Sequence, residues 1–310
     1  MKKYAFGADI GGTTIKLGLF ETLGNLIEVW EIPTRIEENG KYILIDIAAS
    51  IEEKLKEKKI SKLDVEGIGM GVPGPVGRDG NVLKCVNLGW GVFNVEKEMT
   101  TLTGFKAKAG NDANVAALGE MWQGGGKGYS DIVMVTLGTG VGGGVIIGGK
   151  ILTGINGAAG EIGHIRMKDD EEFACGCGNK GCLEQYASAT GLVRLAKRYF
   201  EKNTKNSILT GKEITAKEVF DAAKAGDAAA LEITEEFGAY LGQALVNLAA
   251  TVDPAVFVIG GGVSKAGDIL LDIVRKYFYD HAFYGNQKTK ILLATLGNDA
   301  GIYGAAKQVL

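Results

Sequence analysis

Three of the four cysteines in this chain, Cys175, Cys177 and Cys182, lie within eight positions, and His164 precedes them. Three thiolates and one imidazole are a standard ligand set for structural zinc in a closed tetrahedral site. A disulfide would leave an odd thiol, and the spacing contains no Cys-x-x-Cys redox pair. The remaining cysteine, Cys85, is isolated, which fits a reducing cytoplasm where disulfides are rare. The sequence therefore predicts a zinc site.

Two carboxylates flank this cluster, Glu161 on one side and Glu184 on the other. They could be ordinary surface charges. Glu161, however, lies inside the stretch AAGEIGH, which is too rich in glycine and apolar residues for a surface charge run. A carboxylate that accepts hydrogen bonds from two neighbouring hydroxyls is a suitable group for holding a sugar. A zinc ion bound between the two positions would fix both carboxylates from one loop.

A polar pair, Asn111 and Asp112, starts an expected helix in the stretch GNDANVAALGE. Either residue could cap the helix, because Asn and Asp are both favoured at that position. Since one cap residue is enough, the other side chain is available for another role. Phosphoryl transfer to an alcohol needs a carboxylate that accepts the hydroxyl proton. We expect Asp112 to be that base.

Glycine is unusually frequent, with 48 residues against 4 prolines, and it gathers in a few turns. The first turn, in Asp9-Ile-Gly-Gly-Thr-Thr, leads into a strand, whereas the dinucleotide-binding and Walker A loops lead into a helix. This favours a phosphate held at the tip of a β-hairpin, with Asp9 beside it to hold Mg²⁺ directly or through water. A similar tip spans 138–144, and a third cluster, 260–262, ends a strand and is expected to open a helix. The alternative is that all three are merely tight turns.

The order of expected elements repeats. Strand, glycine turn, strand, turn and strand open the chain, and the same pattern restarts at Asp131. Helices are expected at 43–59, at about 188–200, within 215–250, after Gly262 and in the C-terminal tail. The uncharged stretch 132–149 contains seven glycines in 18 residues, so we interpret it as two strands and a turn and not as a membrane span. The sequence thus predicts a weak internal duplication of two α/β lobes.

The charge balance argues against nucleic-acid binding. The formal net charge is −3 and the isoelectric point is about 5.6, so no basic surface is available to follow a nucleic-acid backbone. After two lysines, the first apolar run ends at Asp9, which is too short for a secretion signal. We expect a cytoplasmic protein without nucleic-acid or membrane partners.

Several motifs resemble, in order, those of the bacterial glucokinases in the ROK family (repressors, open reading frames and kinases). They are ADIGGTTIKLG, GMGVPGPV, NLGW, GNDANVAALGEMW, VTLGTGVGGG, GINGAAGEIGH, CGCGNKGCLEQYAS and IGGGVS. The resemblance implies the sugar kinase, actin and heat-shock ATPase superfold, which is α/β with two actin-like (ribonuclease-H-like) lobes around a cleft. We expect one lobe to comprise 1–118 and 298–310, and the other to comprise 119–297 with the zinc loop. The implied activity is ATP-dependent phosphorylation of the 6-hydroxyl of glucose.

The resemblance also implies roles for individual residues. The sugar hydroxyls would be held by Gly74, Asn87, Asn111, Asp112, Glu161, His164 and Glu184. ATP and Mg²⁺ would be held by Asp9, Gly11, Gly12, Thr13, Thr14, Gly138, Thr139, Gly140, Gly142, Gly261 and Gly262. His164 would serve twice, with one ring nitrogen on structural Zn²⁺ and the other toward the sugar. The family also implies a homodimer.

Two alternatives stay open on the sequence. A kinase for another hexose or for an N-acetylated amino sugar would carry the same phosphate-binding motifs. A sugar-responsive repressor of the same family would carry a helix-turn-helix segment before the first hairpin. Asp9 follows the first residue by only eight positions, so the sequence disfavours the repressor.

Overall fold

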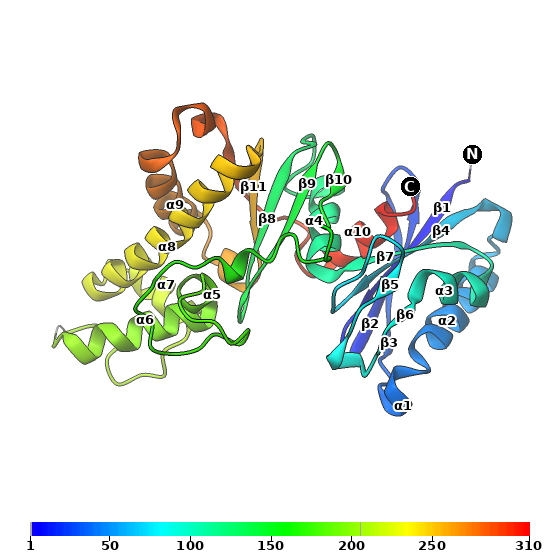
Figure 1. Ribbon diagram of the computed structural model, residues 1–310, viewed down its shortest axis with the longest axis horizontal. Helices are drawn as coiled ribbons and strands as arrows, with labels where there is room; N and C mark the ends of the chain where they lie inside the picture. Colours follow the sequence, from blue (N-terminus) through cyan, green and yellow to red (C-terminus); the bar gives the residue numbers. More distant parts are fainter. Residues whose placement is uncertain (1, 205) are drawn as a thin grey trace. The chain divides into compact units, whose positions relative to one another are not determined.

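The computed structural model describes residues 2–204 and 206–310, which form two compact units (Figure 1). The first unit is the described part of Met1–Ser130 together with Gly144–Gly160 and Leu296–Leu310. The second unit comprises Asp131–Gly143 and Glu161–Thr295. The chain therefore passes between the units at four places, and one of them lies inside a β-strand.

The first unit is built on a five-stranded mixed sheet. Its strands, in spatial order, are β3 (Leu26–Pro33), β2 (Thr14–Glu21), β1 (Tyr4–Ile10), β4 (Val65–Val72) and β7 (Lys106–Asn111). β1 pairs antiparallel with β2, whereas β4 pairs parallel with both β1 and β7. The predicted first hairpin is thus confirmed, and its glycine turn lies at the carboxyl end of β1. The carboxyl ends of β1, β4 and β7 meet at one edge, where ligands bind in open α/β sheets.

The second sheet repeats this strand order. Its strands are β10 (Lys150–Ile151), β9 (Val141–Ile147), β8 (Ile132–Leu137), β11 (Val256–Gly260) and β12 (Lys290–Leu293). β11 lies parallel to both β8 and β12. In each sheet, the first strand of the repeat lies between its hairpin partner and a parallel strand that comes much later. The predicted duplication is therefore visible in the topology, and the uncharged stretch 132–149 forms two strands and a turn.

Helices cover both faces of the first sheet. They are α1 (Glu37–Gly40), α2 (Ile43–Lys58), α3 (Val95–Thr103), α4 (Asp112–Gln123) and α10 (Ala300–Lys307). Alternate residues of β1 point to opposite faces: Phe6 and Ala8 join the core that includes Ile47 and Met99 of α2 and α3, while Ala5 joins the cluster under α10. Figure 1 shows α2 and α3 on one side of the strands and the red C-terminal helix α10 on the other.

Glycines let α10 approach the sheet and α4 closely. A Cβ atom on Gly69 of β4 would lie 1.6 Å from the carbonyl oxygen of Ala305. On the other side of α10, a Cβ on Gly304 would lie 1.6 Å from the carbonyl oxygen of Val115 in α4. Real Cβ atoms do not tolerate such contacts, so glycine is required at both positions. The last helix of the chain is therefore an integral part of the first unit.

Apart from β8, β11, β12 and the start of β9, the second unit is mostly helical. Its helices are α5 (Glu184–Ala187), α6 (Ala189–Lys202), α7 (Ala216–Lys224), α8 (Ala228–Val252) and α9 (Asp268–His281). Long α8 is apolar on much of its surface and is buried at Phe237, Leu241 and Leu245. Among residues 2–204 and 206–310, no helix combines the length and the apolar composition that crossing a membrane requires.

Short elements complete the two units and include differences from the sequence prediction. They are β5 (Asn81–Val82), β6 (Phe93–Asn94) and the 3₁₀ turns η1 (Lys62–Asp64), η2 (Val86–Leu88), η3 (Ile162–His164), η4 (Gly262–Ala266), η5 (Tyr284–Lys288) and η6 (Gly297–Asp299). The triple-glycine cluster was expected to open a helix, but it opens η4, and α9 begins only at Asp268. Gly267, with φ of 76°, separates the two. The sequence also did not predict α3 or β12.

Candidate functional site

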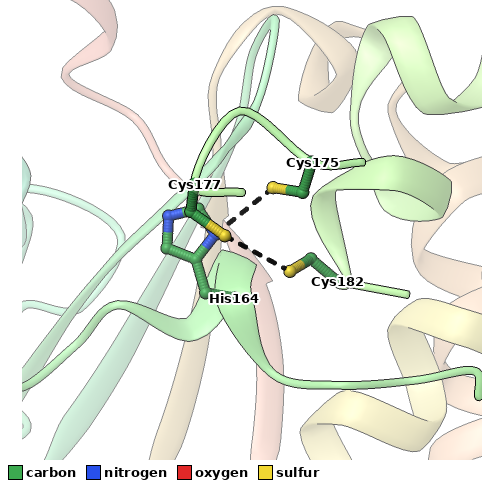
Figure 2. Close-up of side chains that lie close together, drawn as sticks. All are labelled: His164, Cys175, Cys177 and Cys182. Atoms are coloured by element: carbon green, nitrogen blue, oxygen red, sulfur yellow. Dashed lines mark hydrogen bonds between the residues drawn. The ribbon is translucent and has the colours of Figure 1, made fainter. Parts of the chain in front are cut away.

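Four side chains of the second unit point toward one another, as predicted for a metal site (Figure 2). The ligand atoms of His164, Cys175, Cys177 and Cys182 all lie within 4.8 Å of one another. His164 Nδ1 lies 3.7 Å from Cys175 Sγ, and Cys177 Sγ lies 3.7 Å from Cys182 Sγ. In a tetrahedral site with zinc–sulfur bonds of about 2.3 Å, neighbouring sulfurs are about 3.8 Å apart. The donor types and their separations fit zinc.

The alternatives to zinc fit less well. All four cysteines are free thiols in the described chain. The 3.7 Å between Cys177 Sγ and Cys182 Sγ is far longer than a disulfide bond of about 2.05 Å. The structure therefore favours a metal over a disulfide.

Backbone hydrogen bonds shape the zinc loop, which we define as residues 164–182. The Cys175 amide donates to the Asn179 carbonyl at 2.7 Å, and the Gly178 amide donates to the Cys175 carbonyl at 2.8 Å. These bonds make a tight hairpin, and Gly178 supplies the φ of 89° that it needs. An isolated bridge between Arg166 and Cys182 then places Cys182 beside the chain that leaves His164. Local geometry thus assembles the ligand set.

His164 lies between the two flanking carboxylates. Its Nδ1 faces the cysteines and is 3.9 Å from Glu184 Oε1, while its Nε2 is 4.0 Å from Glu161 Oε2. Glu184 Oε1 also accepts a hydrogen bond from the Cys175 thiol at 2.8 Å. The side chain of Glu161 is 61 % exposed and that of Glu184 is 23 % exposed, so both can meet a ligand. The second unit therefore brings the three predicted sugar-binding residues Glu161, His164 and Glu184 together.

The second glycine turn lies beside Glu184. A Cβ atom on Gly140 would lie 2.5 Å from Glu184 Oε2. Thr190 Oγ1 at the start of α6 donates to the Thr139 carbonyl at 2.6 Å, and the Gly138 amide donates to the Gly140 carbonyl at 3.0 Å. The predicted phosphate turn and one predicted sugar carboxylate therefore share a surface. Gly142 follows in β9.

A hollow of about 360 Å³ opens at this surface. Its lining comes from the glycine turn, the zinc loop, α5 and α6: Thr139, Gly140, Ala174, Cys175, Gly176, Glu184, Gln185, Thr190, Gly191 and Arg194. It therefore joins the predicted phosphate turn to the zinc loop within one unit.

A second hollow of about 220 Å³ lies at the third glycine cluster. Its walls come from α7, η4 and the start of α6: Ala189, Ala216, Lys217, Phe220, Asp221, Lys224, Gly262, Val263, Lys265 and Ala266. An apolar hollow with lysines at its edge suits a purine base with a ribose and phosphates. Of its lining, the sequence predicted only Gly262. The α7 stretch AKEVFDAAK reads as an ordinary amphipathic helix, and no sequence signal shows that it packs beside η4.

Gly261, which precedes the lining residue Gly262, cannot be replaced by a residue with a Cβ atom. Its φ is 84°, and a Cβ atom would lie within 2.5 Å of the Leu137 carbonyl oxygen. This close approach holds η4 against the end of β8.

In the first unit, Asp9 and Asp112 lie on either side of Gly71. A Cβ atom on Gly71 would lie 3.3 Å from Asp9 Oδ1 and 3.8 Å from the Cα of Asp112. Burial and, to a smaller extent, the charge of Asp112 raise the pKa of Asp9, and Lys16 offsets part of the effect, so that the pKa is about 6. Two carboxylates in a partly desolvated site are the groups that a hard divalent cation prefers. The pair therefore fits Mg²⁺.

The cap of α4 is Asn111, which leaves the neighbouring carboxylate for another role. Asn111 Oδ1 accepts the amides of Ala113 and Asn114 at 3.1 and 3.2 Å. Asp112 Oδ1 accepts from Asn111 Nδ2 at 2.9 Å and from the Ala113 amide at 2.8 Å. These bonds fix the orientation of the Asp112 carboxylate at the helix N-terminus.

The other predicted sugar residues of the first unit lie in joined loops. Asn111 Nδ2 is 3.5 Å from the Gly74 carbonyl, and Cys85 Sγ donates to the Pro73 carbonyl at 3.1 Å. Cys85 begins the turn η2, where Asn87 is exposed. Gly74, Asn87 and Asn111 therefore belong to one connected region of this unit.

The first glycine turn joins β1 to β2. The Gly11 amide donates to the Thr14 carbonyl at 3.0 Å, and Thr34 Oγ1 donates to the Gly11 carbonyl at 2.7 Å. Gly12, Thr13 and Thr14 are exposed at the tip.

One glycine in each cluster is not required by the fold. A Cβ atom on Gly12, Gly138 or Gly262 would meet nothing within 4 Å, and none of the three has φ in the left-handed region. A tight turn alone would therefore accept alanine at these positions. Close approach of a ligand to the backbone is the remaining physical reason for glycine there.

Comparison with known proteins assigns the chain to a family. The model of the ROK family matches residues 5–310. The chain belongs to the ROK family. A glucokinase of Halalkalibacterium halodurans is 42 % identical to this chain over 308 residues. The alignment covers 97 % of this chain and 93 % of the relative. A glucokinase of Streptomyces coelicolor is 36 % identical, with 97 % of this chain and 95 % of the relative covered.

A solved structure supports the same assignment. This chain is similar to the crystal structure of a ROK family glucokinase from Streptomyces griseus in complex with glucose and AMPPNP. The two chains are 36 % identical, the TM-score is 0.74, and the alignment covers 98 % of each chain. The predicted family and the α/β two-lobe fold are therefore confirmed.

Proposed function

We propose that this chain is a glucokinase that transfers the γ-phosphoryl group of ATP to the 6-hydroxyl of glucose. The observation that carries the proposal is the position of His164, which has one ring nitrogen toward three cysteines and the other toward Glu161, with Glu184 beside it. This arrangement offers two carboxylates and an imidazole to the hydroxyls of a sugar. The family and the glucokinases among the relatives support it.

In the proposed reaction, Asp112 is the general base. The 6-oxygen of glucose forms a bond to the γ-phosphorus, its proton passes to the Asp112 carboxylate, and the bond from the γ-phosphorus to the leaving oxygen of ADP breaks. Mg²⁺ bound with ATP neutralises phosphate charge, and Asp9 is its proposed protein partner. Asn87, Asn111 and the Gly74 carbonyl are proposed to complete the sugar site.

The nucleotide is proposed to lie along the three glycine clusters. The turns Gly11–Thr14 and Gly138–Gly142 take the phosphates, while Gly261 and Gly262 take the adenosine beside the hollow that Phe220 and Val263 line. Zinc held by His164 and the three cysteines would be structural and would fix the loop between Glu161 and Glu184.

A coupled assay of ADP release tests the proposal. With Mg²⁺, ATP and glucose, the purified protein is expected to turn over, and omission of glucose should abolish the signal. Absence of turnover with every hexose tested would contradict a sugar kinase. Competition of glucose against mannose, N-acetylglucosamine and N-acetylmannosamine then separates a glucokinase from kinases for other sugars.

Three further properties are proposed with the function. The lobe boundaries are proposed at 1–118 with 298–310, and at 119–297; they differ from those of the compact units, which assign 119–130, 144–160 and 296–297 to the first unit. A homodimer is proposed, and light scattering coupled to size exclusion tests it. A cytoplasmic location is proposed because Cys85 is an isolated thiol, which suits a reducing compartment where disulfides are rare.

A further inference from the structure

A buried carboxylate that the proposed reaction does not use lies within the zinc loop. The side chain of Glu171 is 0 % exposed. Its Oε2 accepts the hydroxyl of Tyr186 at 2.6 Å, and its Oε1 accepts the Phe173 amide at 3.1 Å. Arg198 Nη2 donates to both oxygens at 2.9 Å, and the Arg194 guanidinium forms a second ion pair.

These partners keep Glu171 charged although it is buried. Burial alone would raise its pKa, but the surrounding hydrogen-bond donors and the two arginines outweigh burial and lower the pKa to about 2. A buried carboxylate with this many partners is held in one place, because loss of a hydrogen bond to it leaves a buried charge incompletely paired.

The partners come from three separate segments. Glu171 and Phe173 precede the first cysteine ligand, Tyr186 lies in α5 just after the last one, and the two arginines lie on consecutive turns of α6. The Arg194 guanidinium also lies 5.6 Å from the ring centroid of Phe173 and 5.7 Å from that of Tyr186. The carboxylate therefore ties two segments to α6, one before and one after the three cysteine ligands.

Gln185 provides a second tie between the same two segments. Its Oε1 accepts the Cys182 amide at 3.1 Å, and its Nε2 donates to the Phe173 carbonyl at 2.9 Å. Gln185 is itself buried, with 8 % of its surface exposed. Neither tie involves the metal ligands' side chains.

Both ties act on the residues that follow Glu184. Glu184 begins α5, which has only four residues and gains little stability from its own hydrogen bonds. Its carbonyl accepts Ser188 Oγ at 2.6 Å, and its neighbours Gln185 and Tyr186 are the tied residues. These side-chain contacts therefore help to fix the Glu184 backbone, together with the bonds that the Leu183 and Gln185 amides donate to the Ile165 and Cys182 carbonyls.

We propose that Glu171 is a positioning residue for the sugar-binding carboxylate Glu184, acting by clamping the segments before and after the three cysteine ligands to α6. The clamp works alongside the metal: zinc would hold the four ligands together, and Glu171 holds the segments before and after the three cysteines. The part that concerns sugar rests on the proposed function, whereas the effect on the metal does not.

Two mild variants test the clamp without removing the buried charge. Glu171→Asp keeps the carboxylate but shortens its reach by one methylene, and Arg198→Met keeps the apolar stem but removes one guanidinium. Arg275→Met is the matched control, because Arg275 Nη2 donates to the Ile291 carbonyl at 2.8 Å in the same unit but away from the loop. Circular dichroism and thermal melting identify folded variants.

The first measurement is the rate at which zinc passes to a chromogenic chelator. In both clamp variants this rate is expected to rise about tenfold, the effect of losing one hydrogen bond to a charged group. The control is expected to stay within about twofold of the parent protein. An unchanged rate in both folded clamp variants would overturn the proposal.

The second measurement is steady-state kinetics with glucose and with ATP. The KM for glucose is expected to rise about tenfold, while the KM for ATP stays within about twofold. Faster zinc release with an unchanged KM for glucose would overturn the link to Glu184. Unfolding of both clamp variants would make Glu171 a residue of global stability and also overturn the proposal. If the parent protein phosphorylates no sugar, the proposed function fails, and the zinc measurement still decides whether the clamp exists.

Discussion

At the scale of single residues, the adjacent pair Asn111 and Asp112 shows how one helix start can serve two purposes. Asn111 takes the cap and accepts two amides of the first turn, so the helix does not need the aspartate as its cap. Asp112 is instead oriented by the Asn111 amide group and by the Ala113 amide. A base held in one orientation needs no reorganisation when the substrate binds.

Replacement of Asp112 by Asn should therefore abolish most turnover and leave the fold intact. The side chain keeps its shape but can no longer accept the hydroxyl proton, so kcat is expected to fall by about 10²–10⁴. Glucose affinity is expected to stay within about tenfold, because the other sugar contacts remain. Steady-state kinetics and isothermal titration with glucose measure the two effects. Turnover near the parent level would remove Asp112 from the role of base.

The raised pKa of Asp9 predicts a pH dependence. Its value of about 6 lies above the ordinary 3.8, so the folded state holds this proton more tightly than the unfolded state does. Mg²⁺ requires the ionised form, and kcat/KM for MgATP is expected to fall about tenfold per pH unit below about pH 6. A pH–rate profile of the parent protein measures this.

The raised pKa of Asp9 also predicts how the stability of the variant Asp9→Asn, relative to the parent protein, depends on pH. The proton is bound in the folded state below about pH 6, so ionising Asp9 as the pH rises costs the metal-free parent protein up to about 3 kcal/mol. The neutral amide avoids this cost, so the variant is expected to be the more stable of the two at pH 8 and nearly equal at pH 4. Urea unfolding at both pH values decides the matter. An equal stability difference at both pH values would contradict the assigned pKa.

At the scale of elements, the three glycine clusters combine two kinds of glycine. Gly261 is required by its backbone conformation and by the nearness of Leu137. Gly12, Gly138 and Gly262 face open space with ordinary φ angles, so the fold does not select them. The turns are thus both tight and open to a ligand. The sequence of the turns alone could not show which glycines the fold requires and which it does not.

Substitution of Gly12, Gly138 or Gly262 by Ala should impair nucleotide binding without loss of stability. Each methyl group would occupy space that the phosphates or the adenosine need, and the KM for ATP is expected to rise about tenfold. The free energy of unfolding is expected to stay equal or to rise by about 0.4–1 kcal/mol, because alanine restricts the unfolded chain. Gly91→Ala, also at an open position, is the control for the KM for ATP. Unchanged KM values for ATP in all three variants would favour simple turns.

The zinc loop is expected to affect the sugar more than the nucleotide. Cys177→Ser removes one ligand from a set whose atoms lie next to Glu161 and Glu184. Zinc content measured by atomic absorption should fall, and the KM for glucose should rise by about tenfold or more, with a smaller change for ATP. Stripping zinc from the parent protein with a chelator should produce the same difference. An equal loss of both affinities would indicate general unfolding of the second unit.

At the scale of the whole molecule, the chain ends return to the first unit. The last helix, α10, packs on β4 through Gly69 and on α4 through Gly304, with no room for a Cβ atom at either contact. The helix that starts with Asp112 is therefore held by a segment almost two hundred residues away in the sequence. The repeated strand order of the two sheets places a glycine turn after the first strand of each.

Replacement of Gly69 by Ala should destabilise the protein markedly. The new Cβ would lie 1.6 Å from the Ala305 carbonyl oxygen, so α10 must move away from the sheet. The free energy of unfolding is expected to fall by about 1–3 kcal/mol or more. Gly12→Ala, with open space at its Cβ, is the matched control and should not be destabilised. Equal unfolding curves for the two variants would contradict the close packing of α10.

The sequence by itself determined the elements and groups that depend on neighbours along the chain. The glycine hairpin after Asp9, the helix cap at Asn111 and the four metal ligands of one loop all follow from local spacing, because turns, caps and short ligand sets are formed by residues close in the sequence. The family motifs extended this to the α/β fold and to the activity. The lengths of α2 and α6 were also predicted to within a few residues.

Tertiary structure alone decided what depends on residues far apart. It placed α7 beside η4 to form a hollow, raised the pKa of Asp9 by burial beside Asp112, and surrounded Glu171 with Tyr186 and two arginines. It also has a 3₁₀ turn at the triple glycine, where the sequence predicts the start of a helix. Burial and long-range contacts carry no local pattern, because the partner of a buried charge or of an open glycine can come from any element that the fold brings beside it.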